Sequence, residues 1–157
     1  MKIAIDLVCT SNNSGSKTYN SKFLKYLSKL KIENEIIIFI CKGLYGSLKK
    51  DLKINKKIKF EIKSDKLSIP LNRLIWVQFI LPFKLKSQGV NILYSPLNMI
   101  PLLNKIFKIK SILCLHSNLP WVFFDKMPGN IVRNILTKYL MQFSIYCCDK
   151  LIVNSNF

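Results

Sequence analysis

Hydrophobic and polar positions follow two different patterns along this chain, which predict strands and helices in alternation. Six short apolar runs have the length and composition of buried strands. They are Lys2–Val8, Glu35–Cys41, Lys57–Lys63, Asn91–Ser95, Ile109–Leu115 and Leu151–Val153. Strict alternation in the third run predicts a strand with one solvated face, near an edge of the sheet.

Between these runs, apolar residues recur at the three- and four-residue spacing of amphipathic helices. The first helix is predicted from Tyr19, Phe23, Leu24, Leu27 and Leu30, and a weaker helical pattern covers residues 43–53. A third helix begins at Pro70 and runs to about Lys86, and Pro82 is expected to kink or end it. The last helix follows Pro128 and Gly129, whereas Pro96–Pro101 and His116–Met127 are predicted to be loops.

Strands that alternate with helices favour right-handed crossovers and a parallel sheet with helices on both faces. The predicted fold class is therefore α/β, a doubly wound, mostly parallel and Rossmann-like sheet. A length of 157 residues predicts one domain, and a hydrophobic content of 50% is ample for its core.

The net charge is +17, but the basic residues are spread along the chain. Arg occurs only at Arg73 and Arg133, so 23 of the 25 basic residues are Lys. Sequence-specific readers of DNA bases rely heavily on Arg, so this composition argues against specific nucleic-acid binding. The densest basic segment, Lys49–Lys66, is interpreted as a solvated face that gives weak, salt-sensitive attraction to anionic membranes.

Cysteine usage and hydropathy suggest the compartment. Five Cys residues without a C-x-x-C spacing favour neither a disulfide framework nor a zinc site, and they fit a reducing cytosol. Asp6 interrupts the only candidate signal-peptide core, and no apolar run is long enough to span a bilayer. We expect a cytoplasmic protein, with peripheral contact to the inner face of the cell membrane as a further expectation.

Candidate chemistry falls on two segments that follow strands. Parallel sheets bind ligands beyond the carboxyl ends of their strands. The loop Asn12–Tyr19 leads from the first strand to a helix N-terminus, which favours an anion, although a flexible polar turn explains this composition equally well. His116, the only His, directly follows the fifth strand and is either a structural residue or part of a site. Ser117 and Asn118 would add neutral hydrogen-bonding partners.

Several familiar site patterns are missing from the sequence. There is no P-loop, no nucleophile elbow and no G-x-G-x-x-G fingerprint after the first strand. The second strand also ends at Cys41 and Lys42 without the acidic residue that binds a ribose. These absences argue against a dinucleotide-dependent oxidoreductase.

An ordered set of segments resembles the N-terminal domain of retaining glycosyltransferases with the GT-B fold, in the group 1 or family 4 class. The first strand Met1–Asp6 is similar to that of the family, and Ser14–Tyr19 is similar to its Gly-Gly-x-Gly-x-Tyr loop. Further matching segments are Arg73 with Trp76 and Leu81-Pro82, Asn91–Pro96, His116 in place of a His-Asp pair, and Asp149–Ser155. The resemblance covers nearly the whole chain in the correct order.

The sequence departs from the family pattern at three positions. Ser14 and Lys17 replace two glycines of the loop, and Lys17 narrows the backbone conformations available there. Ser117 replaces the Asp that follows the His. The resemblance also places most donor-binding groups in a C-terminal domain, which we expect to be absent from residues 1–157.

The resemblance implies sugar transfer from a nucleotide-diphosphate donor to a glycan or lipid-linked acceptor, with retention at the anomeric carbon. It implies that His116 lies beside the reacting sugar and that the loop Ser14, Gly15, Ser16 and Lys17 approaches the donor phosphates. Ser117 and Asn118, which follow His116, are candidate contacts to the acceptor or the sugar. No metal and no cofactor are implied beyond the nucleotide-sugar as co-substrate.

Two hypotheses about function remain open from the sequence. The first is one lobe of a glycosyltransferase, inactive alone, which needs a C-terminal partner lobe. The second is a stand-alone module that binds a glycan or an anionic membrane through its Lys-rich face and the helix with Trp76, Phe79 and Phe83. The first hypothesis also predicts an exposed apolar face near the carboxyl ends of the strands or along the last helix.

Overall fold

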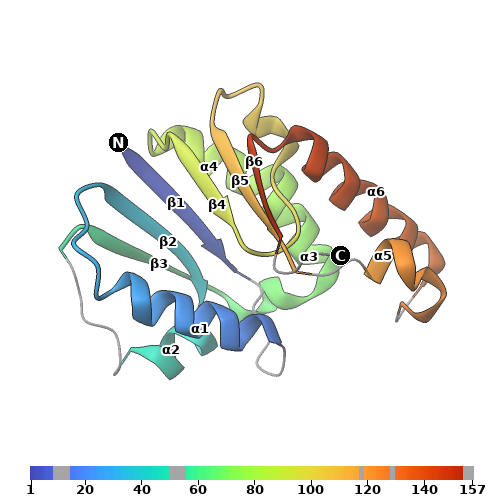
Figure 1. Ribbon diagram of the computed structural model, residues 1–157, viewed down its shortest axis with the longest axis horizontal. Coiled ribbons are helices and arrows are strands. Elements are labelled where there is room, and N and C mark those ends of the chain that lie inside the picture. Colours follow the sequence, from blue (N-terminus) through green and yellow to red (C-terminus); the bar gives the residue numbers. More distant parts are fainter. Residues whose placement is uncertain (9–14, 50–55, 117–118, 128–129, 154–157) are drawn as a thin grey trace.

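The computed structural model describes residues 1–8, 15–49, 56–116, 119–127 and 130–153. These residues form one sheet of six parallel strands in the order β3-β2-β1-β4-β5-β6 (Figure 1). The strands are β1 (Lys2–Leu7), β2 (Glu35–Cys41), β3 (Ile58–Lys63), β4 (Ile92–Ser95), β5 (Lys110–Leu115) and β6 (Lys150–Val153). The predicted α/β fold class and all six predicted strands are confirmed, and β3 lies at an edge as its alternation indicated.

The strand order reverses between β1 and β4. The chain adds β2 and β3 on one side of β1, and then crosses back so that β4 pairs with the other side. The connections that leave β1 and β4 therefore diverge at the edge of the sheet formed by the carboxyl ends of the strands, which we call the carboxyl edge. Such a divergence leaves a crevice in which α/β proteins bind ligands.

Helices cover both faces of the sheet (Figure 1). On one face, α1 (Gly15–Leu27) and α2 (Lys42–Leu48) place Leu24, Leu44 and Leu48 against the Ile-rich side of β1 and β2. On the other face, the path from Pro70 to Ser87 places Trp76, Val77, Leu81 and Leu85 against Ala4, Phe39 and Leu93. Because successive strand residues point to opposite faces, the apolar runs β1 and β2 supply both cores at once.

The helical path from Pro70 to Ser87 changes its hydrogen bonding before Pro82. It consists of α3 (Pro70–Ile75), a π-helical turn (Trp76–Ile80) and α4 (Leu81–Ser87). Pro82 has no amide hydrogen to donate to the carbonyl four residues earlier, and the Leu81 amide instead reaches the Trp76 carbonyl five residues back. The predicted helix to about Lys86 is confirmed, whereas the alternative that Pro82 ends the helix is wrong.

The structure corrects three local predictions. The predicted loop His116–Met127 contains a short helix α5 (Leu119–Val122) and a 3-10 turn (Phe124–Lys126). The second helix covers Lys42–Leu48 and does not include Lys49, although residues 50–53 of the prediction lie outside the described residues. Leu30 lies beyond the end of α1 and is exposed, because α1 stops at Leu27 and only Leu24 of its apolar row is fully buried.

The last helix, α6 (Ile131–Cys147), has an exposed apolar face, as predicted. Asn130 caps its N-terminus by accepting a hydrogen bond from the Val132 amide at 2.7 Å. The buried positions of α6 are Asn134, Met141 and Ser144, whereas most of its large apolar side chains point to solvent. The side of this helix that packs on the protein is therefore more polar than the side that does not.

Candidate functional site

The predicted site residues that the structure describes lie at the carboxyl edge, near the point where the strand order reverses. His116 follows β5, and Gly15 begins α1 after the connection from β1. Tyr19, in the second turn of α1, brings these two places together: its ring packs edge-on against the His116 imidazole with 4.6 Å between ring centroids. The two segments singled out from the sequence therefore meet in space.

His116 is held by the connection that follows β4. Its imidazole forms a hydrogen bond with the Pro96 carbonyl, and its backbone amide donates to the Asn98 side-chain oxygen at 2.6 Å. Burial lowers the pKa of His116 below its ordinary value, and the Pro96 carbonyl opposes this shift only in part. The imidazole is therefore neutral at neutral pH. Its one N–H donates to the Pro96 carbonyl, and its other nitrogen can only accept a hydrogen bond.

Asn98 positions His116 and was not identified from the sequence. Its backbone lies in the left-handed region with φ of 63°, which Asn tolerates better than most residues. The backbone amide of Asn98 donates to the Cys114 carbonyl at 3.4 Å, while its side-chain oxygen accepts from the backbone amide of His116. One residue thus fastens the β4–β5 connection to the end of β5. An Asn between two prolines was the only signal available for it.

Beneath His116 lies an uncharged group formed by Tyr19, Tyr94 and Cys114. The two hydroxyl oxygens are 2.9 Å apart, and the Cys114 thiol also hydrogen-bonds both tyrosines. Burial raises the pKa of Tyr19, of Tyr94 and of the Cys114 thiol. All three groups therefore stay protonated at neutral pH, so they form a wall of the site and are not candidates for a base or a nucleophile.

The predicted phosphate loop is described only in part. Ser14, Ser117 and Asn118 lie outside the described residues. Gly15, Ser16 and Lys17 form the first residues of α1, a helix of 13 residues with no acidic residue in its first turn. A helix N-terminus with a Lys and without a carboxylate favours a nearby anion by its dipole and its charge.

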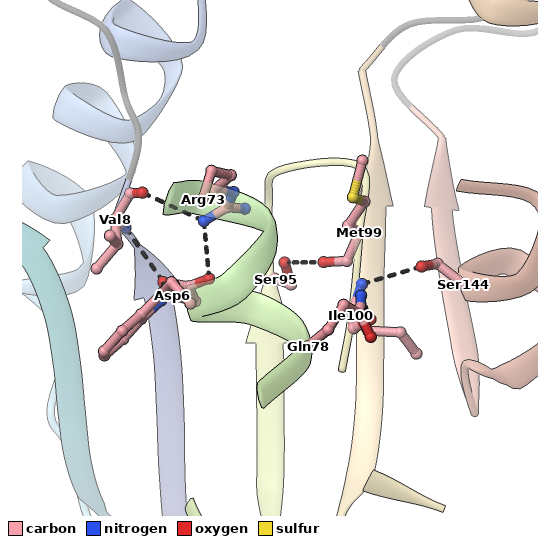
Figure 2. A network of polar contacts seen from close by, with 9 residues as sticks. Asp6, Val8, Arg73, Gln78, Ser95, Met99, Ile100 and Ser144 are labelled. Carbon is pink, nitrogen blue, oxygen red and sulfur yellow. Dashed lines mark hydrogen bonds and ion pairs between the residues drawn. The ribbon is translucent and has the colours of Figure 1, made fainter. Parts of the chain in front are cut away.

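A buried polar network fixes the end of β1, where the connection to α1 begins (Figure 2). Asp6 is 1% exposed and pairs with the Arg73 guanidinium at 3.1 Å. Its carboxylate also accepts from the Val8 amide and from the Trp76 indole, each at 3.2 Å. Arg73 in turn donates to the Val8 carbonyl at 3.2 Å.

This network is structural support for the carboxyl edge. The Asp6 carboxylate already has three partners, so we assign it no chemical step. Sequence reasoning did not predict the contact. Two signals pointed toward it: an acidic residue inside an apolar strand, and one of only two Arg residues at the start of the crossover helix.

A second hollow lies at the opposite edge of the sheet, at the amino ends of the strands. It measures about 920 Å³ and is lined by residues such as Lys2, Glu35 and Lys57. Ligands of parallel α/β sheets bind at the carboxyl ends, and none of the predicted site residues lines this hollow. We therefore keep the carboxyl edge as the candidate site.

Comparisons with protein-family models and with curated protein sequences find no match for this chain. Within the described ranges, no three His, Cys, Asp or Glu side chains gather closely enough to hold a metal ion. None of the helices in the same ranges is both long enough and apolar enough to cross a bilayer.

Proposed function

We propose that these residues form the acceptor-side lobe of a retaining glycosyltransferase with the GT-B fold. The reaction is transfer of a sugar from a nucleotide-diphosphate donor to a hydroxyl of a glycan or a lipid-linked saccharide. The ordered resemblance along the chain supports this proposal. The observation that carries it is the neutral imidazole of His116, held at the carboxyl edge and packed against Tyr19 of the helix that follows the first loop.

Each part of the site has a role that its chemistry suits. Because its N–H is donated to Pro96, the neutral imidazole can serve a sugar hydroxyl only as an acceptor, and it carries no positive charge that would attract the diphosphate. The N-terminus of α1, with Lys17, favours the negative charge that develops on the leaving diphosphate. Tyr19 and Tyr94 form an uncharged wall beside the imidazole, which suits the apolar faces of a sugar ring.

The proposal includes a second lobe, either in the same polypeptide or in a separate chain. Accelerating glycosyl transfer requires preorganised positive charge around the leaving diphosphate. One helix N-terminus with a single Lys provides only part of that charge. We therefore expect residues 1–157 alone to turn over nucleotide-sugars negligibly, and activity to appear when a matching donor-binding lobe is added.

Sugar transfer and donor hydrolysis would be measured for residues 1–157, for a donor-binding lobe and for the two together. His116→Ala should reduce transfer by the pair. Gly15→Val should also reduce it, by blocking close approach of the backbone to the phosphates. Gly46→Val is the matched control, because Gly46 lies in α2 and a Cβ there meets no atom within 4 Å.

Binding can be followed without the second lobe. In NMR titrations of residues 1–157, nucleotide-sugars should shift the signals of the α1 N-terminus and of His116, and His116→Ala should weaken binding. Signals that move only at the amino edge of the sheet would contradict the proposed site. Rapid turnover by residues 1–157 alone would contradict the need for a second lobe. If His116→Ala leaves the transfer rate of the two lobes together unchanged, His116 is not part of the site.

A further inference from the structure

The helix α6 presents an apolar stripe to solvent on the side away from the sheet. Seven large apolar residues of this helix are each at least 42% exposed. They are Ile131, Val132, Ile135, Leu136, Tyr139, Phe143 and Tyr146. Their spacing of three and four residues places them on one side of the helix.

On the opposite side of α6, buried polar side chains form hydrogen bonds. The Ser144 hydroxyl accepts from the Ile100 amide at 3.2 Å and donates to the Leu140 carbonyl at 2.7 Å. The Asn134 side chain donates to the Met127 carbonyl at 3.1 Å. These hydrogen bonds fix the orientation of the helix. The outward apolar stripe therefore does not result from a rotated or loosely packed helix.

A second outward stripe runs along the helical path from Pro70 to Ser87. Leu71, Ile75, Phe79 and Phe83 are four residues apart, and each is at least 43% exposed. The wider π-helical turn at 76–80 keeps this four-residue spacing in line. Trp76, which the sequence suggested for the same surface, is buried in the core and does not belong to the stripe.

A groove of about 390 Å³ lies where one end of the first stripe faces one end of the second. Its walls come from the first turns of α3 and from the N-terminal half of α6, and they include Leu71, Val132 and Leu136 from the two stripes. Arg73 and Arg133, the only arginines of the chain, also line it. We call this combined area the α3–α6 surface.

The helices α3, α4 and α6 carry only basic charges, although Arg73 pairs with Asp6 of β1 and Lys84 pairs with Glu61 of β3. No Asp or Glu occurs between Asp65 and Asp125, and none occurs in α6. Arg133 and Lys138 flank the stripe of α6, while Lys84 and Lys86 follow the stripe of the other helix. Two copies of the chain meeting through this surface would bring like charges together, which disfavours self-association.

We propose that the α3–α6 surface docks on an anionic lipid bilayer. An outward apolar face with aromatic residues and flanking cations is the pattern of helices that lie in the membrane interface. The apolar side chains enter the boundary between headgroups and acyl chains, and Arg133 and Lys138 contact the acidic headgroups. Tyr139 and Tyr146 are suited to the headgroup level because their rings are apolar and their hydroxyls polar. This inference does not depend on the proposed transferase activity, and it assigns to a membrane the apolar face of α6 that the first sequence hypothesis assigned to a second lobe.

The test uses residues 1–157 in sedimentation assays with vesicles of phosphatidylcholine alone and vesicles that contain phosphatidylglycerol, at low and high salt. The chain should bind the anionic vesicles, and salt should weaken but not abolish that binding. The triple change Ile135→Gln, Tyr139→Gln and Phe143→Gln should lower partitioning by more than about tenfold. Arg133→Gln with Lys138→Gln should lower it by about 30-fold at low salt.

Matched controls separate the surface from bulk properties. Tyr26→Gln with Leu30→Gln removes exposed apolar area associated with the opposite face of the sheet. Lys56→Gln with Lys59→Gln removes the same charge from the segment Lys49–Lys66, which the sequence suggested as the membrane-binding patch. Both controls should leave binding nearly unchanged. Because every changed side chain is exposed except the half-buried Lys138, melting temperatures should also remain close to that of the parent chain.

Three results would overturn the proposal. The first is equal binding to neutral and anionic vesicles. The second is loss of binding in the Lys56 and Lys59 control but not in the Arg133 and Lys138 variant, which would place the membrane contact at the β3 edge. The third is a dimer in analytical ultracentrifugation that the α6 triple change dissociates, which would assign the surface to a second copy.

Discussion

The guanidinium of Arg73 and the carboxylate of Asp6 form a buried ion pair of 3.1 Å that links two segments 67 residues apart. Asp6 lies near the end of β1, and Arg73 lies in the first helix of the crossover from β3 to β4 (Figure 2). The pair therefore fixes the crossover against the strand beside which the order reverses. Because Val8 bonds to both partners, the same network holds the backbone at the start of the β1–α1 connection.

The first prediction is that Asp6→Asn destabilises the protein by about 3 kcal/mol. The change leaves the guanidinium buried beside a neutral amide. It also replaces one carboxylate oxygen by an NH2 group, which cannot accept the hydrogen bond from the Trp76 indole or the Val8 amide. Urea unfolding followed by circular dichroism measures the loss. Glu35→Gln is the control, because the Lys2–Glu35 pair is exposed and should contribute less than about 1 kcal/mol. Similar losses in the two variants would contradict this account.

The sheet could be predicted from the sequence because its strands are short, apolar and separated by clear helical patterns. The alternation in Lys57–Lys63 even placed β3 at an edge, since only an edge or half-covered strand tolerates a charged face. The exposed stripe of α6 was predicted as one of two places for an apolar face. Periodicity shows that a helix has an apolar side, but tertiary hydrogen bonds such as that of Ser144 decide which side faces the protein.

The sequence identified a site residue only where a rare residue type directly follows a predicted strand. His116 is the single His and directly follows a strand, so its place at the carboxyl edge followed from the parallel topology. Asn98 and Tyr19 could not be assigned to it, because their contacts with His116 depend on how the β4–β5 connection and α1 lie in space. The Asp6–Arg73 pair is similarly a long-range contact that no local pattern encodes.

The second prediction concerns the titration of His116, which is followed without ambiguity because it is the only His. Burial lowers its pKa, so the NMR midpoint should lie below the ordinary value of 6.5. Tyr19→Ala should raise the midpoint toward 6.5, because water then reaches the imidazole. Tyr26→Ala, an exposed change on the same helix, should leave it unchanged. A parent midpoint at or above 6.5 would show that the ring is not desolvated.

The same shift has a consequence for stability. Above pH 6.5 His116 is neutral in both the folded and the unfolded chain, so it adds no pH dependence there. As the pH falls below 6.5, the unfolded chain takes up the proton first, and the free energy of unfolding decreases until the folded pKa is passed. His116→Gln should flatten this part of the stability profile.

The third prediction is that Asp149 contributes stability that is lost only in strong acid. The Ser111 amide donates to its carboxylate at 2.7 Å and, with Lys105 at 3.3 Å, lowers the pKa of Asp149 below its ordinary value of 3.8. The contribution is therefore complete above pH 3.8 and disappears as the pH falls through the folded pKa. Asp149→Asn should cost about 1 kcal/mol at neutral pH and flatten the acid limb. Asp125→Asn, at an exposed residue, should do neither.

The fourth prediction concerns Gln78, whose buried side chain clamps the connection between β4 and β5. Its amide nitrogen donates to the Ile100 carbonyl at 3.1 Å, and its oxygen accepts from the Leu102 amide at 3.2 Å. Gln78→Leu has nearly the same volume but leaves both backbone groups without this partner, so we expect a loss of about 3 kcal/mol. Asn72→Leu, which removes an exposed bond on the same helical path, should cost less than about 1 kcal/mol.

Hydrogen exchange tests whether the clamp acts locally, as the geometry indicates. In Gln78→Leu, the Leu102 amide should exchange faster than the loss of global stability alone explains, whereas amides of β2 should follow global stability. The connection that Gln78 anchors begins with Pro96 and Asn98, the two residues that hold His116. The His116 resonances should therefore shift in Gln78→Leu and not in Asn72→Leu. Unchanged His116 resonances together with fast exchange at Leu102 would contradict this. They would mean that Asn98 fixes the imidazole without help from Gln78.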